Sequence, residues 1–249
     1  MTLLYTEITP EFPRRGRCVF FAADRRITPS GREKPRYYKK LIDIPYLNSA
    51  LGFFGLAEFK RRQTVYRMAD HLRDFVRRQH TANSLPQLAA RLADSLKSFI
   101  PSTLQRSERS GIHLAGIPFG ALPEFWFVRN IDDEGNPTLG QYEAREDFLS
   151  RDARTQGFNG HDPATLPCQD AQLYRNGDIL SHVVAWKALD DTLGRLLGVP
   201  QFRRIQTVEE YAKWIRFKME VLTLFHKRFE TPLLVGGPID VIIKCQHDI

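Results

Sequence analysis

The chain has 249 residues, of which 42% are hydrophobic and 26% are charged. This length suits one large domain or two small ones, and the composition is that of an ordinary globular protein, for which we expect one core. No uncharged apolar run approaches the length that spans a bilayer, and the N-terminus lacks a charged segment followed by an apolar one. We therefore expect a cytoplasmic protein without membrane contact.

The formal net charge of +7 raises the question of an acidic partner such as nucleic acid. The basic residues, however, stand in short scattered groups, and no RNP or zinc-finger signature is present. Solvated helix faces and subunit contacts explain such groups at least as well, so we expect no nucleic-acid partner. The groups are Arg14-Arg15, Arg25-Arg26, Lys60-Arg61-Arg62, Arg77-Arg78 and Arg203-Arg204.

The three cysteines, Cys18, Cys168 and Cys245, are odd in number, far apart and without a C-x-x-C pair. This pattern argues against both a disulfide framework and a zinc site, so we expect reduced cysteines with a structural role. The histidines show no metal-ligand spacing either. We therefore expect neither a metal nor another cofactor.

The N-terminus predicts a β-hairpin. Its strands are residues 2–7 and the apolar run 18–23, which prolines and a glycine separate. A loop centred on Pro13 places Thr2 opposite Asp24. The register matters, because a shift by one residue moves every side chain to the other face of the sheet.

A second hairpin is predicted from residues 36–44 and 51–55. The apolar period then changes from two to between three and four, which predicts an amphipathic helix over residues 57–78. A second helix begins after Ser84 as N-cap and ends before Pro101.

Strands return at residues 111–117 and 124–131, and a polar turn leads on to residues 139–142. Residues 143–173 are polar and irregular. We interpret them as an insertion, because such a long loop inside a compact domain is usually functional or mobile.

We interpret Tyr174-Arg175-Asn176-Gly177-Asp178 as a turn in which Asp178 caps a helix over residues 178–197. The alternative for this motif is a contact with substrate or another subunit. A capping box then opens a long helix over about residues 207–228, and the chain closes with a strand at 239–245.

The order of the predicted elements is strands, two helices, strands, two helices and a strand. Such elements bury their apolar faces best in stacked layers. We therefore predict an α+β fold, a four-layer αββα sandwich in which two antiparallel sheets pack face to face between helical layers. Residues 1–249 are expected to form a single domain that carries the insertion at about 143–173.

Thr2, Asp24 and Lys40 are residue types that together can make a self-activating nucleophile. Removal of Met1, which methionine aminopeptidases perform before small residues, would leave Thr2 with a free amine whose ordinary pKa is roughly 7.7 to 8.0. The amine and the hydroxyl could then act as base and nucleophile within one residue. Taken singly, Asp24 also fits a charge at a strand end or a partner of Arg25 or Arg26, and Lys40 a charge at a strand edge.

Four segments, in order along the chain, carry a resemblance to a known family. They are Phe21-Ala22-Ala23-Asp24-Arg25-Arg26, Lys39-Lys40-Leu41-Ile42-Asp43-Ile44, Gly52-Phe53-Phe54-Gly55-Leu56-Ala57-Glu58 and Gly236-Gly237-Pro238-Ile239-Asp240-Val241. The first three resemble the AADSR strand, the KKI strand and the glycine-rich turn before the first helix in proteasome-type N-terminal nucleophile (Ntn) hydrolases. The fourth resembles the C-terminal strand of proteasome-like bacterial peptidases such as the Anbu group. That family has a four-layer αββα fold.

The resemblance implies a role for each matching residue. Thr2 would be the nucleophile, Asp24 the carboxylate that orients it, and Lys40 the cation that lowers the pKa of the Thr2 hydroxyl or amine. Lys39 would face the other way, because neighbouring residues of a strand point to opposite sides. A backbone N–H at Phe54-Gly55 would donate to the oxyanion of a tetrahedral intermediate.

The sequence departs from the family at three places. The spacer between Thr2 and Asp24 is longer than usual, and neither the G-S-G turn nor the late RDxxSGG element is evident. Ser181 is the candidate for the serine of the former, and residues 229–237 replace the latter without its Asp or Ser. Next to His182, the same serine also fits a helix cap, because adjacent helix residues point in different directions.

The resemblance implies a threonine peptidase that cleaves peptide or amide bonds through an acyl-enzyme on Thr2. It further implies a homo-oligomer, as a ring or a related assembly, that acts on peptide or protein substrates, with an ATP-dependent unfoldase as a candidate partner. Two alternatives stay open: an inactive subunit that serves as a scaffold or binding module, and an Ntn amidohydrolase that cleaves a small amide.

Overall fold

The structure, a computed structural model, describes most of the chain in nine ranges. These are residues 2–27, 34–119, 122–132, 136–137, 139–146, 172–178, 185–202, 205–229 and 235–247. Within them, the strands form two larger antiparallel sheets and two short strand pairs. The α+β class predicted from the sequence is confirmed.

One sheet has the order β12-β1-β2-β13 and the other has the order β11-β10-β9-β6-β5. The strands of the first are β1 (Leu3–Phe12), β2 (Gly16–Asp24), β12 (Gln172–Gly177) and β13 (Ile239–Cys245). Those of the second are β5 (Leu41–Ile44), β6 (Ser49–Gly55), β9 (Ser110–Gly116), β10 (Glu124–Arg129) and β11 (Glu143–Arg145).

The helices and the short strands complete the described elements. The helices are α1 (Met68–Arg78), α2 (Leu85–Phe99), α3 (Ser102–Ser107), α5 (Trp186–Leu196), α6 (Val208–Phe229) and the 3-10 turn η1 (Pro45–Leu47). The short pairs are β3 (Arg26–Ile27) with β4 (Arg36–Tyr37), and β7 (Glu58–Arg61) with β8 (Thr64–Arg67).

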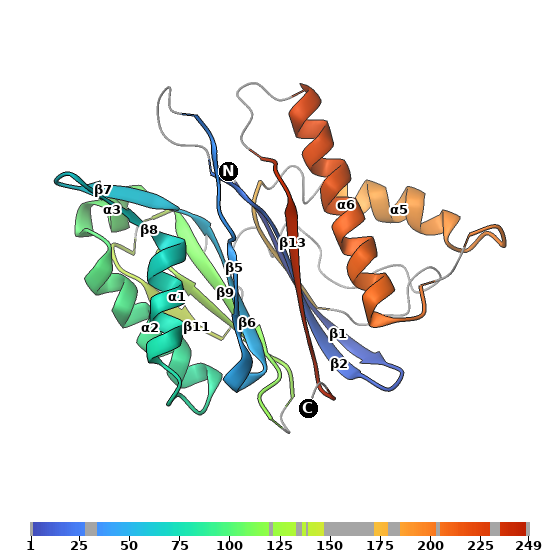
Figure 1. Cartoon of the computed structure of the whole chain (residues 1–249), viewed down its shortest axis with the longest axis horizontal. Helices are drawn as coiled ribbons and strands as arrows, with labels where there is room; N and C mark the ends of the chain where they lie inside the picture. Colours follow the sequence, from blue (N-terminus) through green and yellow to red (C-terminus); the bar gives the residue numbers. More distant parts are fainter. Residues whose placement is uncertain are drawn as a thin grey trace.

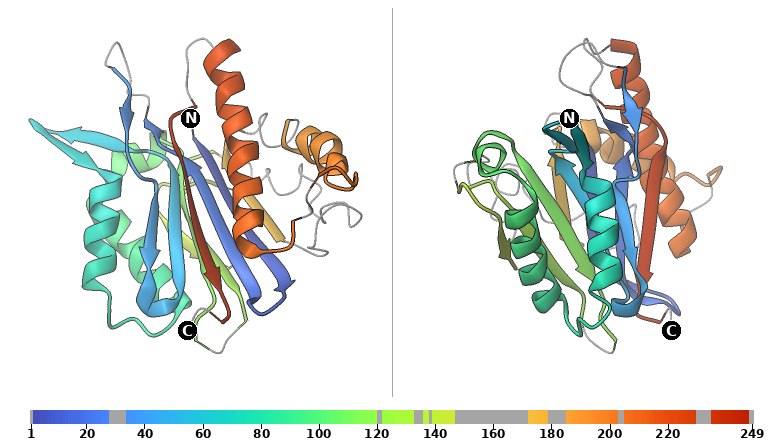
Figure 2. Two further views of the ribbon diagram at one scale, coloured as in Figure 1. Left: turned by 45° about the vertical axis from the view of Figure 1, so that its right-hand side comes forward. Right: turned by 60° about the vertical axis from the view of Figure 1, so that its left-hand side comes forward.

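The helices lie on the outer faces of the two sheets. Figures 1 and 2 show α1 and α2 on the outer face of the β5-containing sheet, and α5 and α6 on the outer face of the sheet that contains β1 and β13. The inner faces of the two sheets lie against each other (Figure 1). Among the helices of the described ranges, none is long and apolar enough to cross a membrane.

Alternating side chains of the central strands supply separate apolar clusters. In β1, Leu3 and Tyr5 pack toward α5 and α6, whereas Leu4 and Ile8 pack between the sheets. In β2, the side chains of Cys18, Phe20 and Ala22 also pack toward α5 and α6. Both faces of β1 and β2 are therefore buried, and β1 also buries the polar side chains of Thr6, Glu7 and Thr9.

Two helix starts follow their sequence signals. Ser84 caps α2 by accepting a hydrogen bond from the Gln87 N–H at 3.4 Å. At α6, Thr207 Oγ1 accepts from the Glu210 N–H and Glu210 Oε2 accepts from the Thr207 N–H, both at 3.2 Å. This is the reciprocal capping box that the sequence predicted.

The helix predicted over residues 57–78 is wrong in its first half, because α1 begins only at Met68. The preceding residues form the β7–β8 hairpin, where Phe59 stacks on Tyr66 with ring centroids 5.4 Å apart. The Met68 N–H donates to the Ala57 carbonyl at 2.9 Å and closes the hairpin at its base. A cross-strand aromatic pair stabilises a hairpin. Here this stabilisation prevails over the helix that the spacing of the apolar residues predicted.

The predicted register of the first hairpin is wrong by one residue. Leu4 lies opposite Ala23, so that Asp24 lies across from Leu3 rather than from Thr2. The hairpin turn contains Arg14 in the left-handed region, and an irregularity between Thr9 and Phe12 shifts the pairing. An extra residue in one strand moves the register of everything beyond it, which turn residues alone do not reveal.

Three further predictions differ from the structure. Tyr174-Arg175-Asn176-Gly177 belongs to β12 and is not a turn, because it pairs along β1. Of the helix predicted over residues 178–197, the structure describes α5 from Trp186 on, and the cap at Asp178 stays a prediction because residues 179–184 lie outside the described residues. The predicted strand 36–44 divides into β4 and β5, and the strand expected at 139–142 lies instead at β11. Within the predicted insertion, residues 147–171 lie outside the described residues.

The prediction of reduced cysteines is wrong for two of the three. Cys18 of β2 and Cys245 of β13 form a disulfide, with Cα atoms 4.1 Å apart and a sequence separation of 227 residues. The two residues lie directly opposite each other in the antiparallel register. Only strand pairing brings them together, so spacing along the chain could not indicate it. Cys168 lies outside the described residues.

The disulfide yields the first prediction. Alkylation of the unfolded, unreduced protein should label one cysteine, and labelling after reduction should reach all three. Reduction should lower the free energy of unfolding by about 2 to 4 kcal/mol, because the cross-link restricts the unfolded chain. Urea unfolding with and without reductant measures the change, and the Cys18→Ala variant should show no such difference. Labelling of all three cysteines before reduction would contradict the disulfide.

A buried histidine connects the two sheets. His113 of β9 lies with Nδ1 2.9 Å from Thr6 Oγ1 and with Nε2 2.6 Å from Asn176 Oδ1. Thr6 is in β1 and Asn176 in β12, so one imidazole joins the inner faces of both sheets. Burial lowers the pKa of His113 from 6.5 to about 4, and the hydrogen bond to Asn176 only partly offsets this effect.

The second prediction follows from that pKa. Because the folded-state pKa of His113 lies below the unfolded value, its contribution is complete above pH 6.5 and is lost as the pH falls toward 4. The loss should amount to about 3 kcal/mol in the free energy of unfolding. Urea unfolding at pH 7 and at pH 4 should show a smaller decrease for His113→Gln than for the wild type. Equal decreases would mean that His113 is not held neutral.

Candidate active site

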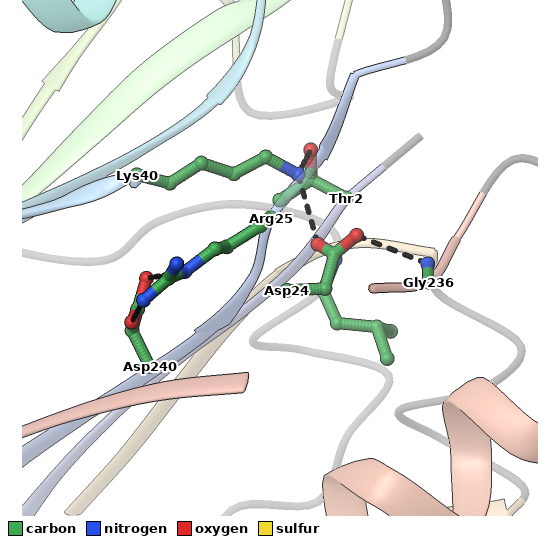
Figure 3. A network of polar contacts seen from close by, with 7 residues as sticks. Thr2, Asp24, Arg25, Lys40, Gly236 and Asp240 are labelled. Atoms are coloured by element: carbon green, nitrogen blue, oxygen red, sulfur yellow. Dashed lines mark hydrogen bonds and ion pairs between the residues drawn. The ribbon is translucent and has the colours of Figure 1, made fainter. Parts of the chain in front are cut away.

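The structure brings Thr2, Asp24 and Lys40 together. Lys40 directly precedes β5, and its Nζ lies 2.9 Å from Thr2 Oγ1 and 2.9 Å from Asp24 Oδ1 (Figure 3). Lys39, its neighbour, is exposed, as the strand alternation predicted. Residues at the ends of three separate strands thus meet at a single ammonium group.

Asp24 is also held by main-chain groups. Its Oδ1 accepts from the Leu3 N–H at 2.8 Å, and its Oδ2 accepts from the Gly236 N–H at 3.2 Å. Gly236 is fixed in turn, since its carbonyl accepts from the Arg26 N–H at 3.0 Å. The carboxylate therefore connects the start of β1 with the segment before β13. Sequence reasoning compared this glycine with the family's C-terminal strand but did not assign it this contact.

The site is closed to water. Asp24 and Lys40 are at most 1% exposed, and Thr2 is 5% exposed. Burial lowers the pKa of Lys40 from its ordinary value of 10.5, while the Asp24 charge and hydrogen bond act in the opposite direction. The Lys40 ammonium donates to Thr2 Oγ1, and its charge would stabilise negative charge on that oxygen.

A second ion pair, between Arg25 and Asp240, lies beside the site. The Arg25 guanidinium binds both carboxylate oxygens of Asp240, with Nε 2.8 Å from Oδ2 (Figure 3). Asp240 belongs to β13, so this pair fastens β2 to β13 next to the Asp24 contact with Gly236. Asp24 forms an ion pair with Lys40, and Arg25 pairs with Asp240 instead.

Phe54 and Gly55, predicted as the oxyanion turn, form the end of β6. The Phe53 N–H donates to the Lys40 carbonyl at 3.3 Å, which sets this end of β6 beside the residue that contacts Thr2. Gly55 has φ of 81°, and a Cβ there would lie 1.8 Å from the Arg109 carbonyl oxygen. The turn therefore requires glycine at this position.

The remaining predicted site residue, Ser181, lies outside the described residues. Within the described part of the chain, no group of three or more His, Cys, Asp or Glu side chains is arranged to hold a metal ion.

Comparison with known proteins defines the fold of this chain. No protein-family profile matches the sequence, and no curated protein matches it. The chain does have a proteasome-like Ntn fold.

Solved structures with a similar fold include Anbu proteins. The structure titled Anbu (ancestral beta-subunit) from Yersinia bercovieri is similar with a TM-score of 0.51 and 15% identity, over 97% of this chain and 81% of that one. An Anbu (Gly-1) mutant from Hyphomicrobium sp. strain MC1 has a TM-score of 0.48 and 17% identity, over 98% of this chain and 82% of that one. At these identities the likeness concerns the fold, so activity must be argued from the site.

The third prediction concerns the buried pair. Replacing Lys40 with Met should leave Asp24 buried without its cation and lower the free energy of unfolding by about 3 to 5 kcal/mol. The double variant Asp24→Asn, Lys40→Met should recover much of this loss. Urea unfolding measures both, with Lys39→Met as the matched exposed control, which should stay close to wild type. A double variant no more stable than Lys40→Met would contradict the coupling.

Proposed function

We propose that this protein is a proteasome-like threonine hydrolase that cleaves peptide or amide bonds through an acyl-enzyme on Thr2, once Met1 has been removed. The observation that supports this function best is the 2.9 Å contact between Lys40 Nζ and Thr2 Oγ1 in a buried site. A threonine hydroxyl is a weak nucleophile unless a base or a lowered pKa activates it. Lys40 supplies that activation, and Asp24 holds the Lys40 ammonium in place.

The proposed reaction starts with proton transfer from Thr2 Oγ1 to the free Thr2 amine, while the Lys40 ammonium stabilises the negative charge on the oxygen. The oxygen attacks the substrate carbonyl, and an N–H at Phe54 or Gly55 donates to the oxyanion that forms. The C–N bond then breaks as the leaving nitrogen takes the proton, which produces an ester on Thr2. Water attacks the ester, and the amine of Thr2 accepts a proton from this water and returns it to the hydroxyl.

The proposal includes the complete architecture expected of such an enzyme. The layers visible in Figures 1 and 2 would form a four-layer αββα sandwich, and residues 1–249 a single domain. Copies of the chain would assemble into a homo-oligomeric ring or a related form in the cytoplasm, act on peptides or proteins, and receive substrates from an ATP-dependent unfoldase. Ser181 would support the amine of Thr2.

One observation favours a second candidate, an inactive subunit that serves as a scaffold or binding module. In the chain that still carries Met1, Thr2 is only 5% exposed, so a substrate carbonyl does not reach Oγ1 as long as Met1 is retained. In this alternative, the contact between Lys40 and Thr2 stabilises the two sheets and takes no part in chemistry.

The fourth prediction separates these candidates. Intact mass should show that Met1 is absent, and a β-lactone probe should add one acyl group to Thr2. Thr2→Ala should abolish the addition, whereas Thr9→Ala, a buried threonine of the same strand, should retain it. Lys40→Met should slow the addition by about 100- to 1000-fold, because the Lys40 charge no longer stabilises the oxygen of Thr2 during attack.

Retained Met1, or a folded protein that takes up no probe, would overturn the hydrolase proposal and favour the inactive subunit. Turnover of small amides but not of peptides would keep Thr2 as nucleophile and change the substrate to a small amide.

A further inference from the structure

The last residues of β12 reach the nucleophile from the side opposite to Asp24. We propose that residues 176–178, here called the β12 arm, position Thr2 for attack, and that His113 and His226 hold this arm in place. The inference rests on the proposed function, since it names the residues that orient the same nucleophile. It also gives a new role to the motif Tyr174-Arg175-Asn176-Gly177-Asp178, which we interpreted from the sequence as a turn with a helix cap.

The arm contacts Thr2 through the main chain. The Asp178 N–H donates to the Thr2 carbonyl at 3.0 Å, one residue beyond the point where Gly177 pairs with Leu3. Gly177 has φ of 107°, and a Cβ at this position would lie 1.6 Å from the Thr2 carbonyl oxygen. This close approach is available only to glycine, so the arm and Thr2 fit each other at a fixed distance.

The same peptide group is held at both of its polar atoms. Its carbonyl, from Thr2, accepts from Asp178, and its N–H, from Leu3, donates to Asp24 Oδ1 at 2.8 Å. Two hydrogen bonds on opposite ends of one planar peptide fix its orientation. The Thr2 side chain is attached directly to this group, so the arm limits the positions that Oγ1 can take relative to Lys40 Nζ.

One clamp on the arm comes from helix α6. His226 Nε2 lies 3.2 Å from Asp178 Oδ2, and both side chains are nearly buried, at 10% and 13% exposure. The helix packs on the outer face of the sheet, so this contact ties the residue that binds Thr2 to a long, rigid element. Because Asp178 is held through its side chain, its N–H stays directed at the Thr2 carbonyl.

The other clamp comes from the opposite sheet. Asn176, 2% exposed, has its Oδ1 2.6 Å from His113 Nε2. His113 lies in β9 and also contacts Thr6 of β1, four residues along the strand from Thr2. The arm is therefore held at Asn176 by the sheet that contains β9 and at Asp178 by α6. Placement of a nucleophile within a fraction of an ångström is worth large factors in rate.

The test compares variants of the arm and its clamps by the rate of acylation with the β-lactone probe, resolved into the maximal rate kinact and the half-saturating concentration KI. His226→Leu removes the contact with Asp178 and should lower kinact about tenfold with little change in KI, because a charge-assisted hydrogen bond is lost. His226→Gln, whose amide can still donate to Asp178, should recover most of the rate.

Gly177→Ala should abolish acylation, because the methyl group displaces Thr2. The matched control is Gly140→Ala, which also has a positive φ, of 65°, but whose Cβ would meet only the flexible Arg106 side chain. This control should label at the wild-type rate. A wild-type rate in Gly177→Ala, or equal kinact in His226→Leu and the wild type, would overturn the positioning role.

A second measurement keeps the two proposals apart. Hydrogen exchange of the Leu3 and Asp178 amides, followed by NMR, reports the two bonds directly and needs no activity. Both amides should exchange at least tenfold faster in His226→Leu than in His226→Gln, and unchanged exchange would overturn the inference. If the wild type takes up no probe, the hydrolase proposal fails, and the exchange rates still decide whether the arm holds the Thr2 peptide.

Discussion

The Lys40 amine is buried, and groups at the nearby strand ends replace the hydration that it loses. Burying an ammonium costs several kcal/mol unless an anion and hydrogen bonds replace its hydration. Asp24 provides the anion, and the N–H groups of Leu3 and Gly236 hold that anion in place. The start of β1, the end of β2 and the segment before β13 must therefore converge on one point. Thr2 is brought to Lys40 by the same convergence.

The two sheets make this convergence possible. β1 and β2 are buried on both faces, so their alternating apolar residues pack on α5 and α6 on one side and on the second sheet on the other. Lys40 enters from that second sheet, whereas Thr2 and Asp24 belong to the first. A site built across an interface between packed layers stays rigid, because moving one side would open the core.

Ionic and hydrogen-bonded contacts then fix the sheet edges around the site. On one side, Arg25 binds Asp240 of β13, and the disulfide from Cys18 joins the far ends of the same strand pair. On the other side, β12 pairs with β1 and ends at the Asp178 contact with Thr2. Both neighbours of the central hairpin are thus fastened, which limits the freedom of the Thr2 main chain.

The sequence by itself determined the α+β class, the capped helices α2 and α6, and the residue types Thr2, Asp24 and Lys40, because caps, periodicity and side-chain chemistry are local properties. Only the tertiary structure decided the one-residue shift of the hairpin, the β7–β8 hairpin, the disulfide and the role of residues 176–178. Each of these depends on contacts between segments that lie apart in the chain. The free energy of these contacts is distributed over whole sheets, so no short segment of the sequence determines it.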